Sequence, residues 1–298
     1  MSCSGKLFRW SCLRRLGPII DVRKILHLSD LHFGRSDPVI VGALSRIAKD
    51  LDPDLVAVSG DLTQRARVRE FAAARAFLDG FKAPKVIVPG NHDVPLYNIA
   101  ARFLTPLARY RRHLTPEVEP VFIDQEIVVV GVNTARSLAF KGGRINRLQI
   151  ERAKAWFCDT SNDLVRILVT HHPFDMPGSD GAPDDLVGRA TMALSNLSEC
   201  APDLLLAGHL HLHGIGTTAE RYDLGGRHAI VVQAGTAASM RTRGAPNSFN
   251  LIHVDHAAVG IDRFEWSPVR ATFKLHSTHR FVRRDAEWKP DPAFSKAR

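Results

Sequence analysis

The chain has 298 residues, of which 45% are hydrophobic and 24% are charged. This ordinary globular composition excludes a disordered chain, a collagen and a coiled coil, and no apolar run approaches the roughly 18–20 residues of a membrane span. The net charge of +9 favours anionic partners, but the arginines form small clusters rather than a continuous basic stripe. We therefore expect a small anionic substrate and no stable nucleic-acid partner.

Residues 1–22 are expected to form an N-terminal extension. They make a poor signal peptide, because cations interrupt the apolar residues. Leu7, Phe8, Trp10 and Leu13 lie among these cations, a composition that allows weak contact with a membrane surface. The alternative is a frayed terminus without a role.

Four cysteines occur, Cys3, Cys12, Cys158 and Cys200, and none forms a CxxC pair. Four are too few for a disulfide scaffold in a chain of this length. We therefore expect a reduced, cytoplasmic protein.

Short apolar, β-branched runs alternate with helical stretches along most of the chain. In chain order the pattern predicts a strand at 24–29, a helix at 38–50, a strand at 54–59, a helix at 67–80, a strand at 85–89, a helix at 96–110, a strand at 125–132, a helix at 146–157, a strand at 164–170, a helix at 185–200 and a strand at 204–207. Asn146 and Gln149 have the spacing of a capping box at the start of one helix. Only strands follow, at 216–223, 227–233, 247–255 and 258–266.

The alternation predicts a layered α/β core, and the later strands predict a second, mostly antiparallel sheet. No linker separates two independent units. We expect one domain over residues 23–282 and a loose tail over residues 283–298, where two prolines occur.

Polar clusters follow five of the predicted strands, at the point where each strand ends. They are Ser29-Asp30-Leu31-His32, Gly60-Asp61-Leu62-Thr63, Gly90-Asn91-His92-Asp93, His171-His172-Pro173 and Gly208-His209-Leu210-His211. Each cluster alone has an ordinary explanation as a turn or as a surface histidine. Together they have none, because ligands bind beyond the carboxyl ends of strands, and burying several unpaired Asp and His side chains costs several kcal/mol. Asp, His and Asn side chains suit divalent transition metals, so the sequence predicts a metal site.

The ordered series D-x-H, G-D, G-N-H-D, H and G-H-x-H resembles the calcineurin-like metallophosphoesterase superfamily, over roughly Lys24 to His211. The resemblance implies a four-layer αββα sandwich. Within the superfamily, four segments look most similar to bacterial enzymes of the cyclic-nucleotide phosphodiesterase type: LSDLHFG at 28–34, GNHDVP at 90–95, GTA at 235–237 and NSFN at 247–250.

The resemblance implies a role for each of seven residues, and none of these positions departs from the family pattern. Asp61 would bridge two divalent metal ions. The first ion would also be bound by Asp30, His32 and His211, and the second by Asn91, His171 and His209. His172, beside the ligand His171, would not be a ligand. The ligand types admit manganese, iron, zinc or cobalt.

Two metal ions can clamp the attacking and the leaving oxygen of a displacement at phosphorus, with a metal-bridging hydroxide as the nucleophile. The leaving oxygen then needs a proton. His92 follows the ligand Asn91 and is expected to donate that proton, with Asp93 available to orient it.

The leading hypothesis is a dinuclear metal-dependent hydrolase of small phosphodiesters such as 3',5'- or 2',3'-cyclic nucleotides. An alternative is a nucleotide-sugar lipid pyrophosphatase of the UDP-2,3-diacylglucosamine hydrolase type, which the basic and apolar N-terminus would suit. The third hypothesis is a non-catalytic scaffold on the same fold, against which the complete ligand set argues. The oligomeric state stays open.

Overall fold

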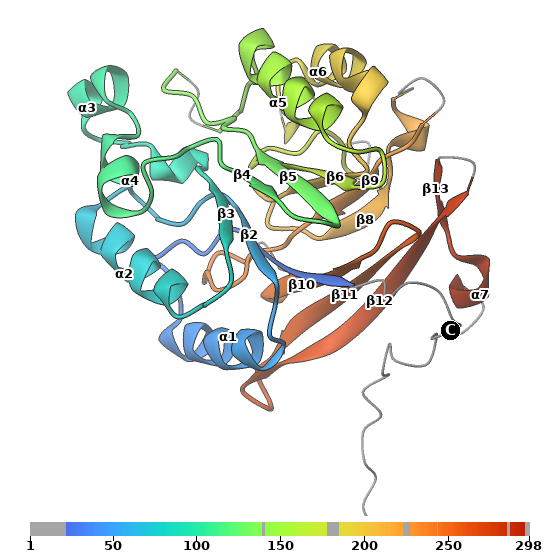
Figure 1. Ribbon diagram of the computed structural model, residues 1–298. Coiled ribbons are helices and arrows are strands. Elements are labelled where there is room, and N and C mark those ends of the chain that lie inside the picture. Colours follow the sequence, from blue (N-terminus) through green and yellow to red (C-terminus); the bar gives the residue numbers. More distant parts are fainter. Residues whose placement is uncertain are drawn as a thin grey trace, which may run out of the picture.

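The computed structural model describes residues 22–138, 141–177, 185–222, 227–242, 244–284 and 287–295. Two sheets lie face to face in the middle of the molecule, and helices cover the outer face of each (Figure 1). The first sheet has the strand order β13-β12-β11-β10-β1-β2-β3, and the second has the order β4-β5-β6-β7-β9-β8. Strands β1, β2 and β3 are parallel to one another, as are β5, β6, β7 and β9.

The strands are β1 (Arg23–Leu28), β2 (Leu55–Ser59), β3 (Lys85–Val88), β4 (Val121–Ile123), β5 (Ile127–Gly131), β6 (Val165–Val169), β7 (Leu204–Ala207), β8 (Gly214–Thr217), β9 (Ile230–Gln233), β10 (Ser248–Val254), β11 (Ala258–Ser267), β12 (Thr272–Arg284) and β13 (Glu287–Pro290). The α-helices are α1 (Pro38–Asp50), α2 (Val68–Asp79), α3 (Ile99–Leu104), α4 (Ala108–His113), α5 (Arg147–Asp159), α6 (Ala190–Leu197) and α7 (Pro292–Ser295). Short 3-10 turns are η2 (Asn91–Asp93), η4 (Ser198–Cys200) and η5 (Thr218–Glu220).

Three apolar layers hold the sandwich together. One core packs α1 and α2 on the first sheet, a second fills the space between the two sheets, and a third packs α5 and α6 on the second sheet. Side chains of a strand alternate between two faces, so Leu26 and Leu28 of β1 face the helices while Ile25 faces the other sheet. The four-layer αββα sandwich predicted from the sequence is confirmed. The later strands do not form a sheet of their own: β10 to β13 extend the first sheet beside β1, and β9 lies parallel to β7 in the second sheet.

Local sequence explains where the helices begin. Asp37 caps α1 by accepting a hydrogen bond from the backbone N–H of Val39 (2.8 Å), and a proline occupies the first turn. The expected capping box of α5 is present: Asn146 Oδ1 accepts from Gln149 N (2.9 Å), and Gln149 Oε1 accepts from Asn146 N (3.0 Å). These contacts satisfy backbone N–H groups that have no partner inside the helix.

The helix predicted over residues 96–110 is instead two short helices, α3 and α4, separated around Thr105-Pro106. Proline has no N–H to donate and disfavours a helical conformation in the residue before it, so the helix stops there. The predicted helix over 185–200 is also shorter and begins only at Ala190.

The loose tail predicted from residue 283 is wrong over residues 283–284 and 287–290. Strand β12 continues to Arg284, and β13 pairs with it antiparallel, with Phe281 opposite Pro290. Trp288 is only 2% exposed because it packs into the core between the sheets. Its Nε1–H and the guanidinium of Arg283 both donate to Asp203 Oδ1 (2.8 and 2.6 Å). Buried aromatic area and these hydrogen bonds fix the strand in place.

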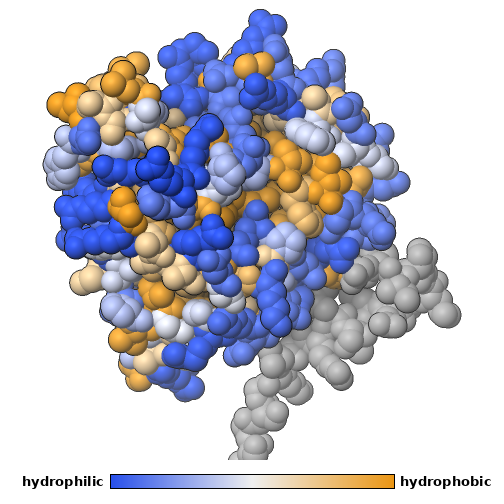
Figure 2. Space-filling view, turned by 60° about the vertical axis from the view of Figure 1, so that its left-hand side comes forward, coloured by the Kyte–Doolittle hydropathy of each residue, from blue (hydrophilic) through white to orange (hydrophobic). Residues whose placement is uncertain are grey.

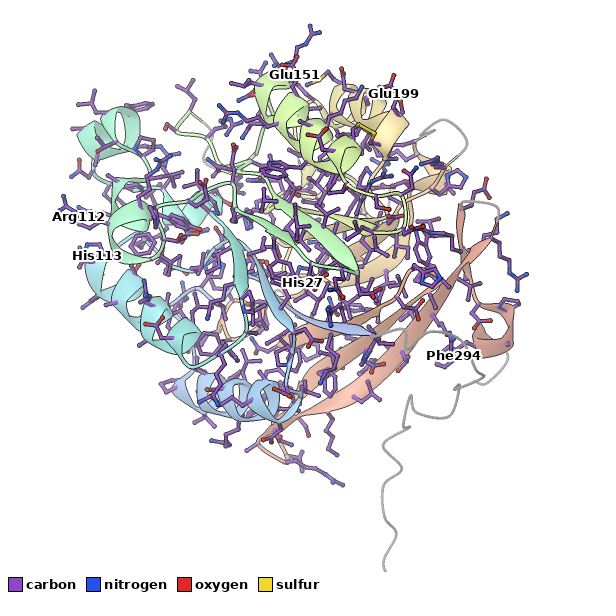
Figure 3. All side chains as sticks on the ribbon, in the orientation of Figure 1. His27, Arg112, His113, Glu151, Glu199 and Phe294 are labelled. Atoms are coloured by element: carbon purple, nitrogen blue, oxygen red, sulfur yellow. A yellow bond between two sulfur atoms is a disulfide. The ribbon has the colours of Figure 1, made fainter. Side chains whose placement is uncertain are left out.

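Cys158 and Cys200 form a disulfide, so the expectation of a fully reduced protein is wrong. The two residues are 42 positions apart, and they meet because α5 packs beside α6 and η4. The yellow bond in Figure 3 lies on this outer helical layer, near the labelled Glu199. Disulfides are typical of oxidising compartments, so cysteine usage no longer supports the expected cytoplasmic location.

The membrane contact expected of the N-terminal extension concerns residues that lie, apart from Val22, outside the described part of the chain. Among the described helices, none has the length and apolar character that crossing a membrane requires.

His27 of β1 lies between the two sheets, near the middle of the molecule (Figure 3). Its Nε2 is 3.0 Å from Ser59 Oγ, and its buried Nδ1 has no hydrogen-bond partner. Burial lowers the pKa of His27 to about 3, although the nearby Asp30 carboxylate raises it slightly. Between about pH 3 and pH 6.5, the His27 imidazole is therefore neutral in the folded chain and protonated in the unfolded chain.

We expect His27 to make stability depend on pH. Because its folded pKa lies below the unfolded value of 6.5, its contribution is complete above pH 6.5 and is lost as pH falls towards 3. The loss amounts to roughly 2 kcal/mol between pH 6.5 and about pH 5. Urea unfolding at both pH values should show a smaller pH effect in His27→Gln than in the wild type. Equal pH effects in the two proteins would contradict the assignment.

Candidate metal centre

The five polar clusters predicted at strand ends meet at one place. They follow β1, β2, β3, β6 and β7, whose carboxyl ends point to the same edge of the sandwich. The side chains that the sequence proposes as metal ligands are all buried, with at most 8% of each residue exposed. Burial of so many titratable groups in one place calls for a compensating charge.

One group of donor atoms comes from the loops after β1 and β7. His211 Nε2 lies 3.1 Å from Asp30 Oδ1 and 3.1 Å from His32 Nε2. His32 Nε2 is also 3.5 Å from the same carboxylate oxygen. Three donor atoms of Asp30, His32 and His211 therefore converge on one small volume.

A second group comes from the loops after β3, β6 and β7. His171 Nε2 lies 3.1 Å from Asn91 Oδ1 and 3.2 Å from His209 Nδ1. Asp61 stands between the two groups: its Oδ2 is 3.4 Å from His171 Nε2 and 3.7 Å from His32 Nε2. A single carboxylate oxygen is thus within reach of both sets of donors.

The remaining atoms of these side chains are held by the protein. Asp61 Oδ1 accepts from the backbone N–H of His92 (2.8 Å), and Asp30 Oδ2 accepts from Ser29 Oγ (2.6 Å) and from His209 N (2.9 Å). The Nδ1–H of His171 donates to Ser59 O (2.8 Å). Partners of this kind fix the ring orientation and leave the other nitrogen as a lone-pair donor towards a cation.

The backbone of the site is strained in a way that the fold must support. Most described non-glycine residues have a negative φ, because a positive φ costs about 1–3 kcal/mol. Five of the proposed ligands adopt it, with φ of 52° at Asp30, 46° at His32, 51° at Asp61, 78° at His209 and 60° at His211.

Gly60 shows why glycine precedes a ligand. Its φ is +85°, and a Cβ there would come within 2.5 Å of His171 Nδ1. The same crowding occurs at Gly208, where a Cβ would meet Ser29 Oγ and Asp30 Oδ2. Only glycine lets the backbone pass this close to the ligand side chains.

The donor set fits a divalent transition metal. Asp30 Oδ1 is buried and accepts no hydrogen bond. Burial lowers the pKa of His171, but the carboxylates of Asp61 and Asp30 outweigh burial and raise it to about 9. Without a cation, these carboxylates thus favour the protonated form of the His171 imidazole. Nitrogen and carboxylate donors in this arrangement are those that manganese, iron, zinc and cobalt accept.

His172 is equally buried, but the protein engages both of its ring nitrogens. Thr134 Oγ1 lies 2.8 Å from Nδ1, and Nε2–H donates to the backbone carbonyl of Lys141 (2.8 Å). Its ring packs 4.4 Å from that of His209, centroid to centroid. His172 also lies near His171 and His209 in a group that could hold a metal, but its contacts with Thr134 and Lys141 occupy both ring nitrogens.

Substitution should separate the two neighbouring histidines. His171→Ala should weaken metal binding by more than about 100-fold, since even a partner outside the ligand set is worth about 10–100-fold. His172→Ala should keep its metal and lose about 1–3 kcal/mol of stability through unpaired buried groups. The metal-to-protein ratio after gel filtration and urea unfolding measure both. Loss of metal in His172→Ala alone would mean that the wrong histidine is assigned.

His92 lies beside the metal ligands and is only partly buried. Its Nδ1–H donates to the backbone carbonyl of Gln64 (2.9 Å), and its Nε2 is 3.3 Å from Arg241 Nη1. Its ring meets that of His32 edge to face, with centroids 4.8 Å apart. Burial lowers the pKa of His92, with His32 and Arg241 adding to the effect and Asp61 opposing it.

The expected contact between Asp93 and His92 is wrong. The Asp93 carboxylate accepts from the backbone N–H groups of Gly90 (2.9 Å), Leu62 (3.2 Å) and Thr63 (2.9 Å), and from Thr63 Oγ1 (2.9 Å). It ties the loop after β2 to the loop after β3. Burial and the neighbouring Asp61 raise its pKa to about 6 despite these hydrogen bonds. Gln64 and Arg241, rather than Asp93, contact the His92 ring.

Comparison with known proteins points in the same direction as the geometry. A family model described as calcineurin-like phosphoesterase matches residues 23–213. Glycerophosphodiester phosphodiesterase GpdQ of Enterobacter lignolyticus is 32% identical over an alignment of 80 residues, and the match covers 23% of this chain and 29% of that protein. The match thus spans less than a third of the relative.

Two solved structures are similar over most of this chain. Purple acid phosphatase PPD1 from yellow lupin seeds has a TM-score of 0.62 at 12% identity, covering 87% of this chain and 53% of its own. A structure of PhoD has a TM-score of 0.65 at 10% identity, covering 90% of this chain and 71% of its own. At such identities the likeness extends to the fold alone.

Proposed function

The chain belongs to the calcineurin-like phosphoesterase family, and from that premise we propose that it hydrolyses small phosphodiesters with two divalent metal ions, cyclic nucleotides being the substrate class. One observation carries the proposal: Asp61 Oδ2 lies within reach of two separate donor groups. A shared carboxylate of this kind is what holds two metals close enough to act on one phosphate. We assign Asp30, His32 and His211 to one ion and Asn91, His171 and His209 to the other.

When bound, divalent ions supply a polarised phosphoryl group and an acidified water. The chain's own residues do the rest. Asn91 contributes a neutral oxygen, so the ligand set leaves net positive charge for an anionic substrate. His92, held by the Gln64 carbonyl, presents Nε2 on the side of the metal ligands, where a proton can pass to the departing oxygen.

A small substrate fits the surface better than a nucleic-acid strand. Binding a strand takes a continuous basic groove with stacking aromatic side chains, whereas aromatic residues are 7% of the chain and its arginines are scattered. The named activity of the bacterial relative, cleavage of a glycerophosphodiester, supports a phosphodiester rather than a monoester. These two points favour a compact phosphodiester.

One observation favours the alternative, a nucleotide-sugar lipid pyrophosphatase. Helix α3 and the turn before it, which follow His92 in the chain, carry four exposed apolar side chains. Tyr97 is 72% exposed, Ile99 69%, Phe103 52% and Leu104 80%. Figure 2 brings the α3 side of the molecule forward and shows apolar side chains gathered in patches among hydrophilic ones. An acyl chain on the substrate would find apolar surface there.

A substrate screen with the manganese-loaded full chain tests the proposal. The panel contains bis(4-nitrophenyl) phosphate, 3',5'- and 2',3'-cyclic nucleotides, a glycerophosphodiester, a diacylated nucleotide sugar and single-stranded DNA. We expect turnover of cyclic nucleotides with little dependence on salt. Turnover of the diacylated sugar alone would establish the alternative, and efficient salt-sensitive cleavage of DNA would contradict both. A chain that binds metal but hydrolyses none of these would be a scaffold.

A further inference from the structure

We infer that Arg241 binds the phosphoryl group of the substrate and that the loop carrying it, described over residues 234–242 and 244–247, holds it at the metal centre. The inference rests on the proposed phosphoester hydrolysis and assigns a residue to it that lies outside the metal-ligand clusters. Arg241 is partly buried, and its Nη1 is 3.3 Å from Nε2 of His92. Its guanidinium therefore lies beside the proposed proton donor, next to the metal-ligand cluster.

The backbone of Arg241 is fixed directly to a metal ligand. Its carbonyl oxygen accepts from Nδ1–H of His211 (2.5 Å), and its own N–H donates to Ser239 Oγ (3.1 Å). The same residue thus orients a proposed ligand through its backbone and reaches the proposed proton donor through its side chain. The positive charge of the guanidinium therefore lies beside His92.

The rest of the loop is pinned to the segment after β1 that carries Asp30. Thr236 Oγ1 donates to Asp30 O (2.7 Å), and Ala237 N donates to Ser29 O (3.0 Å). Near Arg241, Met240 N donates to Arg35 O (3.0 Å). The motif GTA at 235–237, which no ligand role explains, supplies the first two of these anchors.

Asn247 closes the loop from the other side. Its Nδ2 donates to Ser239 O (2.8 Å) and to Thr236 O (3.3 Å), and it is only 4% exposed. These hydrogen bonds fix the backbone from which the Arg241 side chain extends towards His92. Pre-positioned charge is what stabilises a transition state, because no reorganisation is needed when the reaction occurs.

Arginine suits the phosphoryl group in its chemistry. Its planar guanidinium has five N–H donors and binds two phosphate oxygens side by side. In the structure, one N–H of the guanidinium faces His92 Nε2. A bound anionic phosphoryl oxygen would take this N–H, and its negative charge would favour protonation of Nε2, which the proton-donor role of His92 requires. Negative charge on those oxygens grows as the nucleophile adds, so the contact should strengthen in the transition state and act mainly on kcat.

Arg241→Ala tests the inference in the manganese-loaded full chain, with bis(4-nitrophenyl) phosphate as substrate and vanadate as inhibitor. We expect kcat/KM to fall by about 10²–10³, mostly in kcat, and vanadate to bind correspondingly more weakly. Metal content should be unchanged, since the carbonyl that accepts from His211 stays. Free guanidinium at millimolar concentration should restore part of the activity, and Arg241→Lys should recover only part of the loss.

Arg35→Ala is the matched control, because this exposed arginine adjoins the same loop through its backbone. It should retain wild-type kinetics. Wild-type kcat/KM in Arg241→Ala, equal losses in both variants, or a loss that follows metal release and resists guanidinium would each overturn the inference. If the wild type neither hydrolyses the diester nor responds to vanadate, the proposed function itself fails, which is a separate result.

Discussion

Changing Asp61 to asparagine should remove both metals and lower turnover by roughly 10³-fold or more, a loss of several kcal/mol in transition-state stabilisation. The carboxylate uses its two oxygens differently: Oδ1 accepts from the backbone N–H of His92, and Oδ2 faces both donor groups. An asparagine has a single oxygen. If that oxygen keeps the bond to His92, the amide NH₂ turns towards the metals and cannot bind them. Metal analysis of the dialysed protein and assay of a nitrophenyl phosphodiester measure the result.

Asp93→Asn is the control for Asp61→Asn. Asp93 is an equally buried carboxylate in the adjoining loop, but the protein satisfies both of its oxygens. Its substitution should cost about 1–3 kcal/mol of stability, seen in urea unfolding, and leave the metal content of the folded protein unchanged. An Asp61→Asn protein that keeps two tightly bound metals and near-normal turnover would show that the shared ligand is wrongly assigned.

Sequence pattern predicted the fold well wherever burial is periodic. The strands at 24–29 and 204–207 and the helix at 38–50 lie within one residue of β1, β7 and α1, because apolar spacing and caps specify them locally. The sequence pattern predicts neither strand β12 nor strand β13. Strand β12 is largely polar and lies near the edge of its sheet, so tertiary pairing, rather than its own composition, makes it a strand.

The site was predictable in its ligand types and not in its supporting contacts. Asp30 and Asp61 lie together because β1 and β2 are parallel neighbours, and His171 joins them from the second sheet because the two sheets pack face to face. By contrast, Gln64 contacts His92 through a backbone carbonyl, which no side-chain pattern reveals. Arg241 lies in a loop after β9, and no sequence motif connects it with His92. Only the folded structure shows that its side chain reaches His92. The disulfide likewise depends on two helices packing side by side.

His92→Ala should keep both metals and lower kcat by about 10²–10⁴, the usual contribution of a general acid. The metals should stay because the contact of His92 with Asp61 runs through its backbone N–H, which alanine retains. The side chain, in contrast, is held at Nδ1 by Gln64 and presents Nε2 beside Arg241. Turnover with substrates of different leaving groups measures what that nitrogen does.

The loss in His92→Ala should depend on how badly the leaving oxygen needs a proton. A nitrophenolate departs as a stable anion, so the variant should lose little with a nitrophenyl diester. An alkoxide, such as the ribose oxygen of a cyclic nucleotide, departs only when protonated. With such a substrate, kcat should fall by the full factor of about 10²–10⁴. Equal losses with both substrates would assign His92 to positioning the phosphoryl group instead, because a hydrogen bond to a non-reacting oxygen acts regardless of the leaving group.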